Sequence, residues 1–178
     1  MFGGKNMEQK GYIQVYTGNG KGKTTAALGL ALRATCTGKK VFMGQFVKGM
    51  KYSELNAMDY LPYFIIERFG KKCFIYNDPT QDDIDRAVKG LKRCEEIINS
   101  EEYDIVILDE INIALYYKLF SAEDVIKILD KKPEKTEIIL TGRYAPQEII
   151  DRADLVTEMG EIKHYYYKGV KCRKGIEN

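Results

Sequence analysis

The feature that most constrains this chain is the stretch TGNGKGKTT, Thr17–Thr25, which directly follows an apolar strand pattern at Tyr12–Tyr16. Three glycines, two lysines and three threonines fill eight of its nine positions. Because glycine has no side chain, the main-chain N–H groups of such a loop can converge on an anion. A helix that begins at Lys23 adds its positive N-terminal end at the same place. The stretch therefore predicts a phosphate-binding loop between a strand and a helix.

Two side chains of this loop have the chemistry that a bound polyphosphate requires. The Lys23 ammonium can reach the phosphates, and the Thr24 hydroxyl can ligate Mg²⁺. The usual pattern is G-x-x-x-x-G-K-[ST], but Thr17 stands at its first glycine position and Gly18 follows, so the loop is one residue short. The alternative is a glycine-rich turn with surface lysines, which leaves unexplained why Gly22-Lys23-Thr24 opens an apolar helix.

Strand and helix patterns alternate along the rest of the chain, which is typical of an α/β fold with a mainly parallel sheet. Further strands are expected at Lys39–Phe46, Tyr63–Phe69, Tyr103–Glu110, Thr136–Arg143, Leu155–Met159 and Lys163–Gly169. Helices are expected at Lys23–Thr37, from a cap at Thr80 to Ser100, from a capping box of Ser121 with Asp124 to Leu129, and at Ala145–Ala153. Gly49–Leu61 indicates a loop or a weak helix.

Length and composition place the chain in a broad class. Its 178 residues suggest a short flexible arm at residues 1–11 and a single domain at residues 12–178. The 28 basic and 26 acidic side chains nearly cancel, so the net charge gives no reason to expect nucleic acid or a membrane as a partner. Basic residues are in excess only in the last part, from Glu161 on, which predicts either a solvated tail or a rim that attracts an anion.

The cysteines and the histidine do not suggest a structural metal site. Cys36, Cys73, Cys94 and Cys172 are far apart, and His164 is the one histidine. No zinc ligand set can be assembled from them, and scattered cysteines without a signal peptide are typical of reduced thiols in a cytoplasmic protein. No apolar run reaches the length of a membrane span.

Charged side chains follow two of the expected strands, at the edge where parallel sheets bind ligands. Asp109 and Glu110 come after the apolar run at 105–108, and Mg²⁺ is commonly held by one or two carboxylates with phosphate oxygens. An acidic turn is the alternative. Arg143 follows Thr141-Gly142, where its guanidinium can bind phosphate or form a salt bridge to Asp109, Glu110 or Asp151.

Taken together, five segments resemble the ATP:corrinoid adenosyltransferases of the CobA/CobO/BtuR type. They are GNGKGKTTAA (Gly18–Ala27), QFVKG (Gln45–Gly49), VILDEI (Val106–Ile111), LTGRYAPQEIIDRADLVTEM (Leu140–Met159) and KHYYYKGVKCRKGIE (Lys163–Glu177). The resemblance implies a P-loop, RecA-like, three-layer α/β/α fold. It also implies transfer of the 5′-deoxyadenosyl group of ATP to Co(I) of a reduced corrinoid, cobalamin or cobyrinic acid a,c-diamide, with release of triphosphate, in adenosylcobalamin biosynthesis or salvage.

The same resemblance assigns roles to residues and partners. It implies Mg²⁺ or Mn²⁺ as cofactor, a homodimer, a flavodoxin-like electron donor, and a nucleotide that lies reversed relative to ordinary P-loop enzymes. Glu110 matches the metal-binding carboxylate, with Asp109 beside it and Thr24 as a further ligand, and Arg143 matches a phosphate-binding arginine. The nucleotide loop of the family matches Gly18, Asn19, Gly20, Lys21, Gly22, Lys23, Thr24 and Thr25.

The corrinoid side is expected at residues 70–78, where the sequence resembles an aromatic stretch of the family that lies under the corrin ring. Phe74 and Tyr76 are the candidates, and residues two apart on an extended segment share a face. Ordinary core packing is the alternative for both. Gln45 and Lys48 follow a strand and are candidates for nucleotide or corrinoid contacts, whereas His164 is expected to be structural.

The sequence is also compatible with two functions other than adenosyl transfer. One is a P-loop ATPase or kinase that cleaves the terminal phosphate. The other is a RecA-like nucleic-acid-binding ATPase that stacks bases on Tyr165–Tyr167, although the charge balance argues against it.

Overall fold

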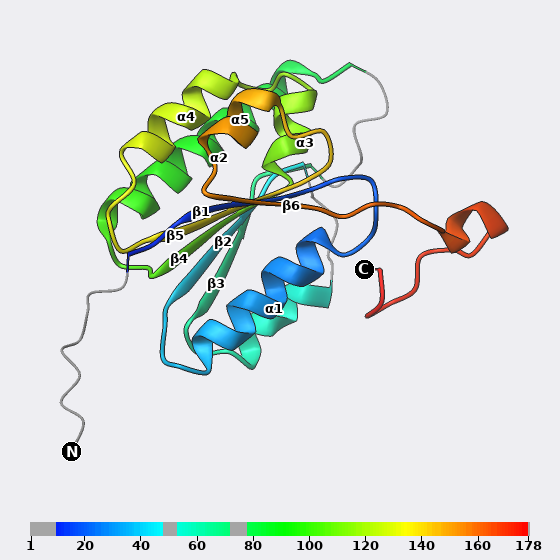
Figure 1. The fold of residues 1–178 in the computed structure, drawn as a ribbon, viewed down its shortest axis with the longest axis horizontal. Helices are drawn as coiled ribbons and strands as arrows, with labels where there is room; N and C mark the ends of the chain where they lie inside the picture. Colours follow the sequence, from blue (N-terminus) through cyan, green and yellow to red (C-terminus); the bar gives the residue numbers. More distant parts are fainter. Residues whose placement is uncertain (1–9, 48–52, 72–77, 178) are drawn as a thin grey trace.

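The structure, a computed structural model, describes residues 10–47, 53–71 and 78–177 and contains a six-stranded sheet (Figure 1). The strands lie in the order β3-β2-β4-β5-β1-β6, and every neighbouring pair is parallel. Their bounds are β1 Ile13–Thr17, β2 Val41–Gln45, β3 Phe64–Arg68, β4 Ile105–Asp109, β5 Glu137–Thr141 and β6 Leu155–Glu158. The predicted parallel sheet is confirmed.

Helices cover both faces of this sheet (Figure 1). The 13-residue helix α1 (Lys23–Thr35) and the 3-10 helix η1 (Ser53–Asp59) lie on one face. The other face carries α2 (Gln81–Ser100), α3 (Ile111–Tyr116), α4 (Ala122–Asp130) and α5 (Gln147–Arg152). The predicted three-layer α/β/α arrangement is therefore confirmed.

The central strand β4 lies between the two helical layers, which explains why residues 105–108 are all apolar. Ile105 and Ile107 belong to the core shared with α1, while Val106 and Leu108 belong to the core under α2 to α5. Each such side chain is buried, which contributes about 1.5–3 kcal/mol apiece to folding. Alternate residues of one strand thus hold both helical layers on the sheet.

Two helices begin where the capping residues of the sequence predicted. Thr80 and Ser121 each form a capping box, with Asp83 and Asp124 respectively. A cap of this kind stabilises a helix by about 1 kcal/mol because it pairs N–H groups that the helix itself leaves unbonded.

The strand expected at Lys163–Gly169 is wrong, because this segment forms the 3-10 helix η2 (Tyr165–Lys168). The His164 ring nitrogen Nδ1 accepts a hydrogen bond from the main-chain N–H of Tyr166 at 3.0 Å, which caps the turn. Gly169 ends it with a φ of 77°, a conformation that glycine adopts without strain. These local bonds hold the segment as a turn beyond the end of β6.

Two other helical elements were not clearly predicted. The short helix α3 follows β4 without any helix signal in its six residues, and η1 lies within the segment expected to be a loop or a weak helix. Lys48, Cys73, Phe74 and Tyr76 lie outside the described residues. Cys36, Cys94 and Cys172 are free thiols.

The division into an arm at residues 1–11 and one domain at residues 12–178 stays a prediction. Of the arm, Gly11 is buried, and its carbonyl accepts a hydrogen bond from Lys132 at 2.9 Å. In the described part of the chain, none of the helices combines the length and the apolar character that crossing a bilayer requires.

Two helical glycines give a matched test of the packing. A Cβ built on Gly90 in α2 lies 2.4 Å from Cγ of the Phe69 ring, whereas one built on Gly29 in α1 meets no atom within 4 Å. Gly90→Ala should therefore lower the free energy of unfolding by about 1–3 kcal/mol through overpacking. Gly29→Ala should raise it by about 1 kcal/mol through helix propensity alone. Urea unfolding measures both values, and a stabilising Gly90→Ala would contradict the packing described here.

Candidate nucleotide-binding site

The loop after β1 borders a cavity of about 650 Å³ at the carboxyl edge of the sheet. Lys23, Glu110 and Arg143, which follow different strands, all line it. The lining is completed by residues of the loop, α1, the segment after β2, η1, α3 and the C-terminal segment: Gly20, Lys21, Gly22, Thr24, Thr25, Leu28, Val47, Ser53, Glu54, Ile113, His164, Gly175, Ile176 and Glu177. The structure thus brings most of the predicted nucleotide residues together, while Gly18 and Asn19 lie in the loop but do not line the cavity.

The first glycines of the loop allow a close contact with the chain after β6, which the sequence did not predict. The N–H of Gly20 donates to the carbonyl of Met159, just after β6, at 2.7 Å. A Cβ at Gly18 or Gly20 would lie 2.6 or 2.7 Å from that same carbonyl oxygen. These glycines therefore let β6 pack against the loop, and the Gly20 amide is used there.

Lys23 folds back onto the loop that carries it. Its Nζ donates to the carbonyls of Gly18 and Gly20, both at 2.7 Å, and the residue is only 8% exposed. Burial lowers the pKa of Lys23, the Glu110 carboxylate partly opposes that effect, and Arg143 adds to it. A polyphosphate in the cavity would offer the ammonium stronger, charged acceptors than the two carbonyls it now contacts.

The Asp109 carboxylate connects three elements at the end of β4. It is fully buried, and its Oδ1 accepts from the hydroxyls of Thr24 at 2.9 Å and Thr141 at 2.7 Å. Its Oδ2 accepts from Gln45 Nε2 at 3.2 Å. Asp109 therefore fixes the direction of the Thr24 hydroxyl, which the sequence assigned to the metal.

Glu110 lies in a left-handed backbone conformation, with a φ of 60°. Its N–H donates to the Thr141 hydroxyl at 2.9 Å. Val47 and Tyr144, which follow the ends of β2 and β5, have φ values of 59° and 61°. Such conformations cost about 1–3 kcal/mol and are enriched at functional sites. Two others, Glu101 and Lys118, occur where α2 and α3 end, but the first three follow strands at the edge where the site was assigned from the sequence.

The donor set at this edge fits a hard divalent cation. Mg²⁺ takes oxygen ligands, usually one or two carboxylates with substrate phosphates and water. Thr24, Asp109 and Glu110 offer such oxygens, and the described residues contain no group of three or more His, Cys, Asp or Glu side chains that would form a metal cage. The Gln45 Oε1 is buried and has no hydrogen-bond partner in the described part of the chain, while Nε2 of the same side chain bonds to Asp109. This is the situation expected of a group whose partner is a bound water or ligand.

Arg143 is exposed and lines the cavity. Among the described residues it forms no ion pair, so the alternative of a salt bridge to Asp109, Glu110 or Asp151 is not what the structure contains. Its guanidinium is thus available to an anion in the cavity.

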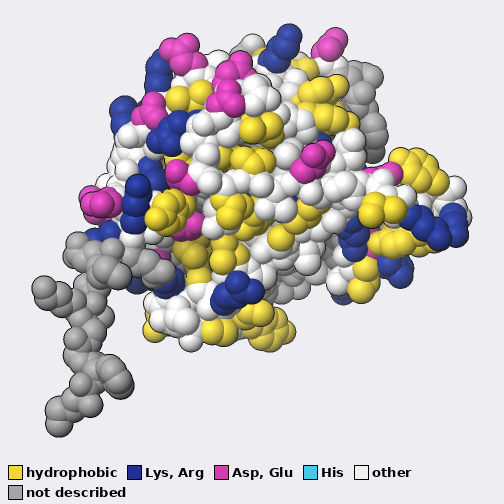
Figure 2. Space-filling view, viewed as in Figure 1, with side chains coloured by type: hydrophobic (Ala, Val, Ile, Leu, Met, Phe, Trp, Pro, Cys, Tyr) yellow, Lys and Arg dark blue, Asp and Glu magenta, His cyan; other side chains and the backbone are white. Residues whose placement is uncertain are grey.

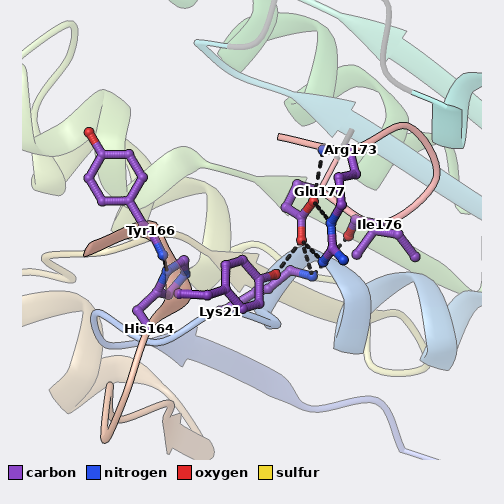
Figure 3. A network of polar contacts seen from close by, with 7 residues as sticks. Lys21, His164, Tyr166, Arg173, Ile176 and Glu177 are labelled. Carbon is purple, nitrogen blue, oxygen red and sulfur yellow. Dashed lines mark hydrogen bonds and ion pairs between the residues drawn. The ribbon is translucent and has the colours of Figure 1, made fainter. Parts of the chain in front are cut away.

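Part of the C-terminal segment lines the same cavity, through His164, Gly175, Ile176 and Glu177. Its basic side chains are exposed, as expected of a solvated tail, but its end contacts the phosphate loop (Figure 3). Lys21 Nζ donates to the carbonyl of Ile176 at 2.9 Å and to Glu177 Oε1 at 3.3 Å. Glu177 also accepts from Arg173 at 2.9 Å and from the Tyr165 hydroxyl. These donors hold the pKa of Glu177 well below its usual range, with Arg173 as the largest cause.

Basic and hydrophobic side chains lie together on the lobe that this segment forms, on the right in Figure 2. Ile162, Tyr166 and Tyr167 are highly exposed there. His164 lines the cavity, but its Nδ1 is used to cap η2, which agrees with its expected structural role.

Comparison with known sequences then decides the family. The sequence profile described as ATP:corrinoid adenosyltransferase BtuR/CobO/CobP matches residues 9–178. The chain belongs to this family.

Relatives within the family match this adenosyltransferase-family chain over almost its whole length. A corrinoid adenosyltransferase from Sinorhizobium sp. is 39% identical, over 96% of this chain and 81% of the relative. One from Escherichia coli (strain K12) is 33% identical, over 96% and 87%. Corrinoid adenosyltransferase CobA from Salmonella typhimurium is 34% identical, with the same coverage.

Solved structures show the same fold at lower sequence identity. A KaiC-like protein, PH0186, from Pyrococcus horikoshii OT3 has a TM-score of 0.56 and 16% identity, over 86% of this chain and 75% of that one. The RadB recombinase has a TM-score of 0.51 and 17% identity, over 88% and 77%. The RecA-like, P-loop fold class implied by the sequence is thereby confirmed.

The tail contacts predict a change in protease sensitivity. Glu177→Gln removes the charge that Arg173 and Lys21 share, so the segment should detach more often and trypsin should cleave faster after Arg173 and Lys174. Glu67→Gln removes a comparable surface ion pair, with Arg93 at 3.1 Å, and is the matched control. Mass spectrometry of the released peptides measures both rates; equal rates in the two variants would show that Glu177 does not hold the tail.

Proposed function

We propose that this protein transfers the 5′-deoxyadenosyl group of ATP to the Co(I) centre of a corrinoid, cobalamin or cobyrinic acid a,c-diamide, and releases triphosphate. The match to the corrinoid adenosyltransferase family over residues 9–178 carries this conclusion. The cavity beside the phosphate loop, with cationic and anionic side chains from separate strand ends, supports it.

The reaction makes particular demands on the protein. The Co(I) electron pair attacks C5′ of the nucleotide, the C5′–O bond breaks, and its electron pair leaves with the triphosphate. Co(I) is a strong nucleophile, so no side-chain base is needed to activate it. The protein must instead align the reactants and stabilise the charge that builds up on the departing triphosphate.

The cationic side chains of the cavity suit that second task. Lys23 would exchange the carbonyls of Gly18 and Gly20 for phosphate oxygens, and Arg143, which lines the same cavity, would also bind the triphosphate. Loop amides from residues 19–25, other than that of Gly20, which bonds to Met159, would complete the phosphate contacts. The short loop supports a nucleotide that lies reversed, with its γ-phosphate where ordinary P-loop enzymes hold β.

Mg²⁺ or Mn²⁺ would be held by Thr24 and Glu110 with Asp109. When bound, the cation neutralises part of the triphosphate charge. Asp109 orients the Thr24 hydroxyl through their 2.9 Å hydrogen bond, and Glu110 presents its carboxylate from the left-handed turn at the cavity wall.

The remaining parts of the proposal rest on the resemblance of the sequence to the family. Phe74 and Tyr76 would lie against the corrin ring, and the protein would act in the cytoplasm as a homodimer that receives electrons from a flavodoxin-like protein. The family match does not favour the ATPase, kinase or nucleic-acid-binding alternatives.

One anaerobic assay tests the function. The protein is incubated with Mg²⁺, ATP and chemically reduced cobalamin, and the corrinoid spectrum and phosphate products are followed. Adenosyl transfer should give a light-sensitive Co–C product and triphosphate. ADP formation with an unchanged corrinoid spectrum would instead establish an ATPase or kinase.

In this assay, Lys23→Ala should lower kcat by about 10²–10³-fold, because the triphosphate loses a preorganised cation as it leaves. Lys39→Ala is the control, since Lys39 pairs with Asp104 at 3.8 Å and does not line the cavity. It should keep wild-type turnover. Full activity of Lys23→Ala would remove that residue from the proposed mechanism.

Phe74→Ala tests the corrinoid side. If Phe74 helps to remove the lower cobalt ligand, the variant should lose more activity when it starts from Co(II) with a reducing system than when it starts from preformed Co(I). The ratio of the two rates, compared with that of the wild type, is the measurement. An equal loss on both routes would assign Phe74 to packing or to binding instead.

A further inference from the structure

We propose that Thr141 is a positioning residue of this site: its hydroxyl links the Asp109 carboxylate to the main chain of Glu110 and so sets the oxygens that receive the divalent cation. The inference rests on the cation site of the proposed function. The sequence predicted a phosphate-binding role for Arg143 but no role for Thr141.

The geometry that carries the inference is a single hydroxyl with two partners. Thr141 ends β5 and is fully buried. Its Oγ1 donates to Asp109 Oδ1 at 2.7 Å and accepts from the Glu110 N–H at 2.9 Å. The hydroxyl therefore ties two consecutive residues of the neighbouring strand end through both its proton and its oxygen.

The bond to Glu110 supports a conformation that the chain would otherwise avoid. With a φ of 60°, Glu110 starts α3, and its carbonyl accepts from the N–H groups of Ile113 and Ala114, both at 3.1 Å. A buried N–H without an acceptor costs about 1–3 kcal/mol. Loss of the Thr141 oxygen would thus favour a different turn, and the Glu110 side chain would point elsewhere.

The bond to Asp109 extends the effect to the phosphate loop. Asp109 Oδ1 also accepts from the Thr24 hydroxyl at 2.9 Å, so Thr141 and Thr24 share one oxygen atom. Without Thr141, that carboxylate loses one of the donors that hold it beside Thr24 and Gln45, so the direction of the Thr24 hydroxyl is less firmly set.

A second contact fastens the same two turns together on the side of Arg143. Asn112 Nδ2 donates to the carbonyl of Gly142 at 3.2 Å. Gly142 has a φ of 130°, and a Cβ there would lie 3.0 Å from Cβ of Asn112. The turn that carries Arg143 and the turn that carries Glu110 are therefore in direct contact, with Thr141 beside their junction.

The test compares two variants that distinguish the effect of the Thr141 hydroxyl from the effect of the shape of its side chain. Thr141→Val keeps the shape and removes the hydroxyl, whereas Thr141→Ser keeps the hydroxyl. Each protein is titrated with Mn²⁺ in the presence of ATP, and free Mn²⁺ is measured by electron paramagnetic resonance. Thr141→Val should bind Mn²⁺ about 10- to 100-fold more weakly, as is typical when a residue that orients metal ligands is lost. Thr141→Ser should stay close to the wild type.

Thr141→Ala removes the hydroxyl without introducing a second methyl group and decides the matter if the valine variant does not fold. Weak Mn²⁺ binding by a folded valine or alanine variant, with serine unaffected, supports the proposal. Wild-type binding by either variant that lacks the hydroxyl, or equal losses in valine and serine, overturns it. Because the readout is cation binding, a wild-type protein that binds Mn²⁺ and ATP but transfers no adenosyl group refutes the proposed function alone.

Discussion

The arrangement of the site depends on one buried carboxylate. A charge with no exposure to water is stable in a protein only when its oxygens are hydrogen-bonded. Asp109 meets this condition with donors from α1, β2 and β5: Thr24, Gln45 and Thr141. Because each donor comes from a different element, the carboxylate also fixes how the phosphate loop, the central strand and its neighbours sit relative to one another. The same hydrogen bonds that stabilise the buried carboxylate thus align groups around the cavity.

The phosphate loop is held from outside as well as from within. On one side, the Gly20 amide bonds to the chain after β6, and on the other, Lys21 bonds to the C-terminal segment. Lys23 closes the loop from inside through two of its own carbonyls. A loop one residue shorter than the usual P-loop is therefore packed between two segments from the end of the chain. His164 and residues 175–177 thereby line a cavity whose loop motif lies near the beginning of the sequence.

The sequence predicted the features that arise from local patterns. Apolar runs such as 105–108 gave the strands, the capping residues Thr80 and Ser121 gave two helix starts, and the strand ends gave Glu110 and Arg143 a common edge. The features that it missed depend on contacts between distant residues. No local signal shows that Glu177 reaches Lys21 across 156 positions. Likewise, the tyrosines at 165–167 have strand propensity, but a histidine cap and a glycine end turn them into a helix.

The distribution of charge in the cavity bears on which bond of ATP breaks. Lys21, Lys23 and Arg143 line it together with the carboxylates Glu54 and Glu110. A kinase or ATPase needs a group that positions a hydroxyl or a water against the terminal phosphorus. The carboxylates could play that part, so the lining alone does not decide between the reactions, and the family match decides it. Adenosyl transfer uses a nucleophile that needs no side-chain base, and the cationic side chains of the lining suit a triphosphate leaving group.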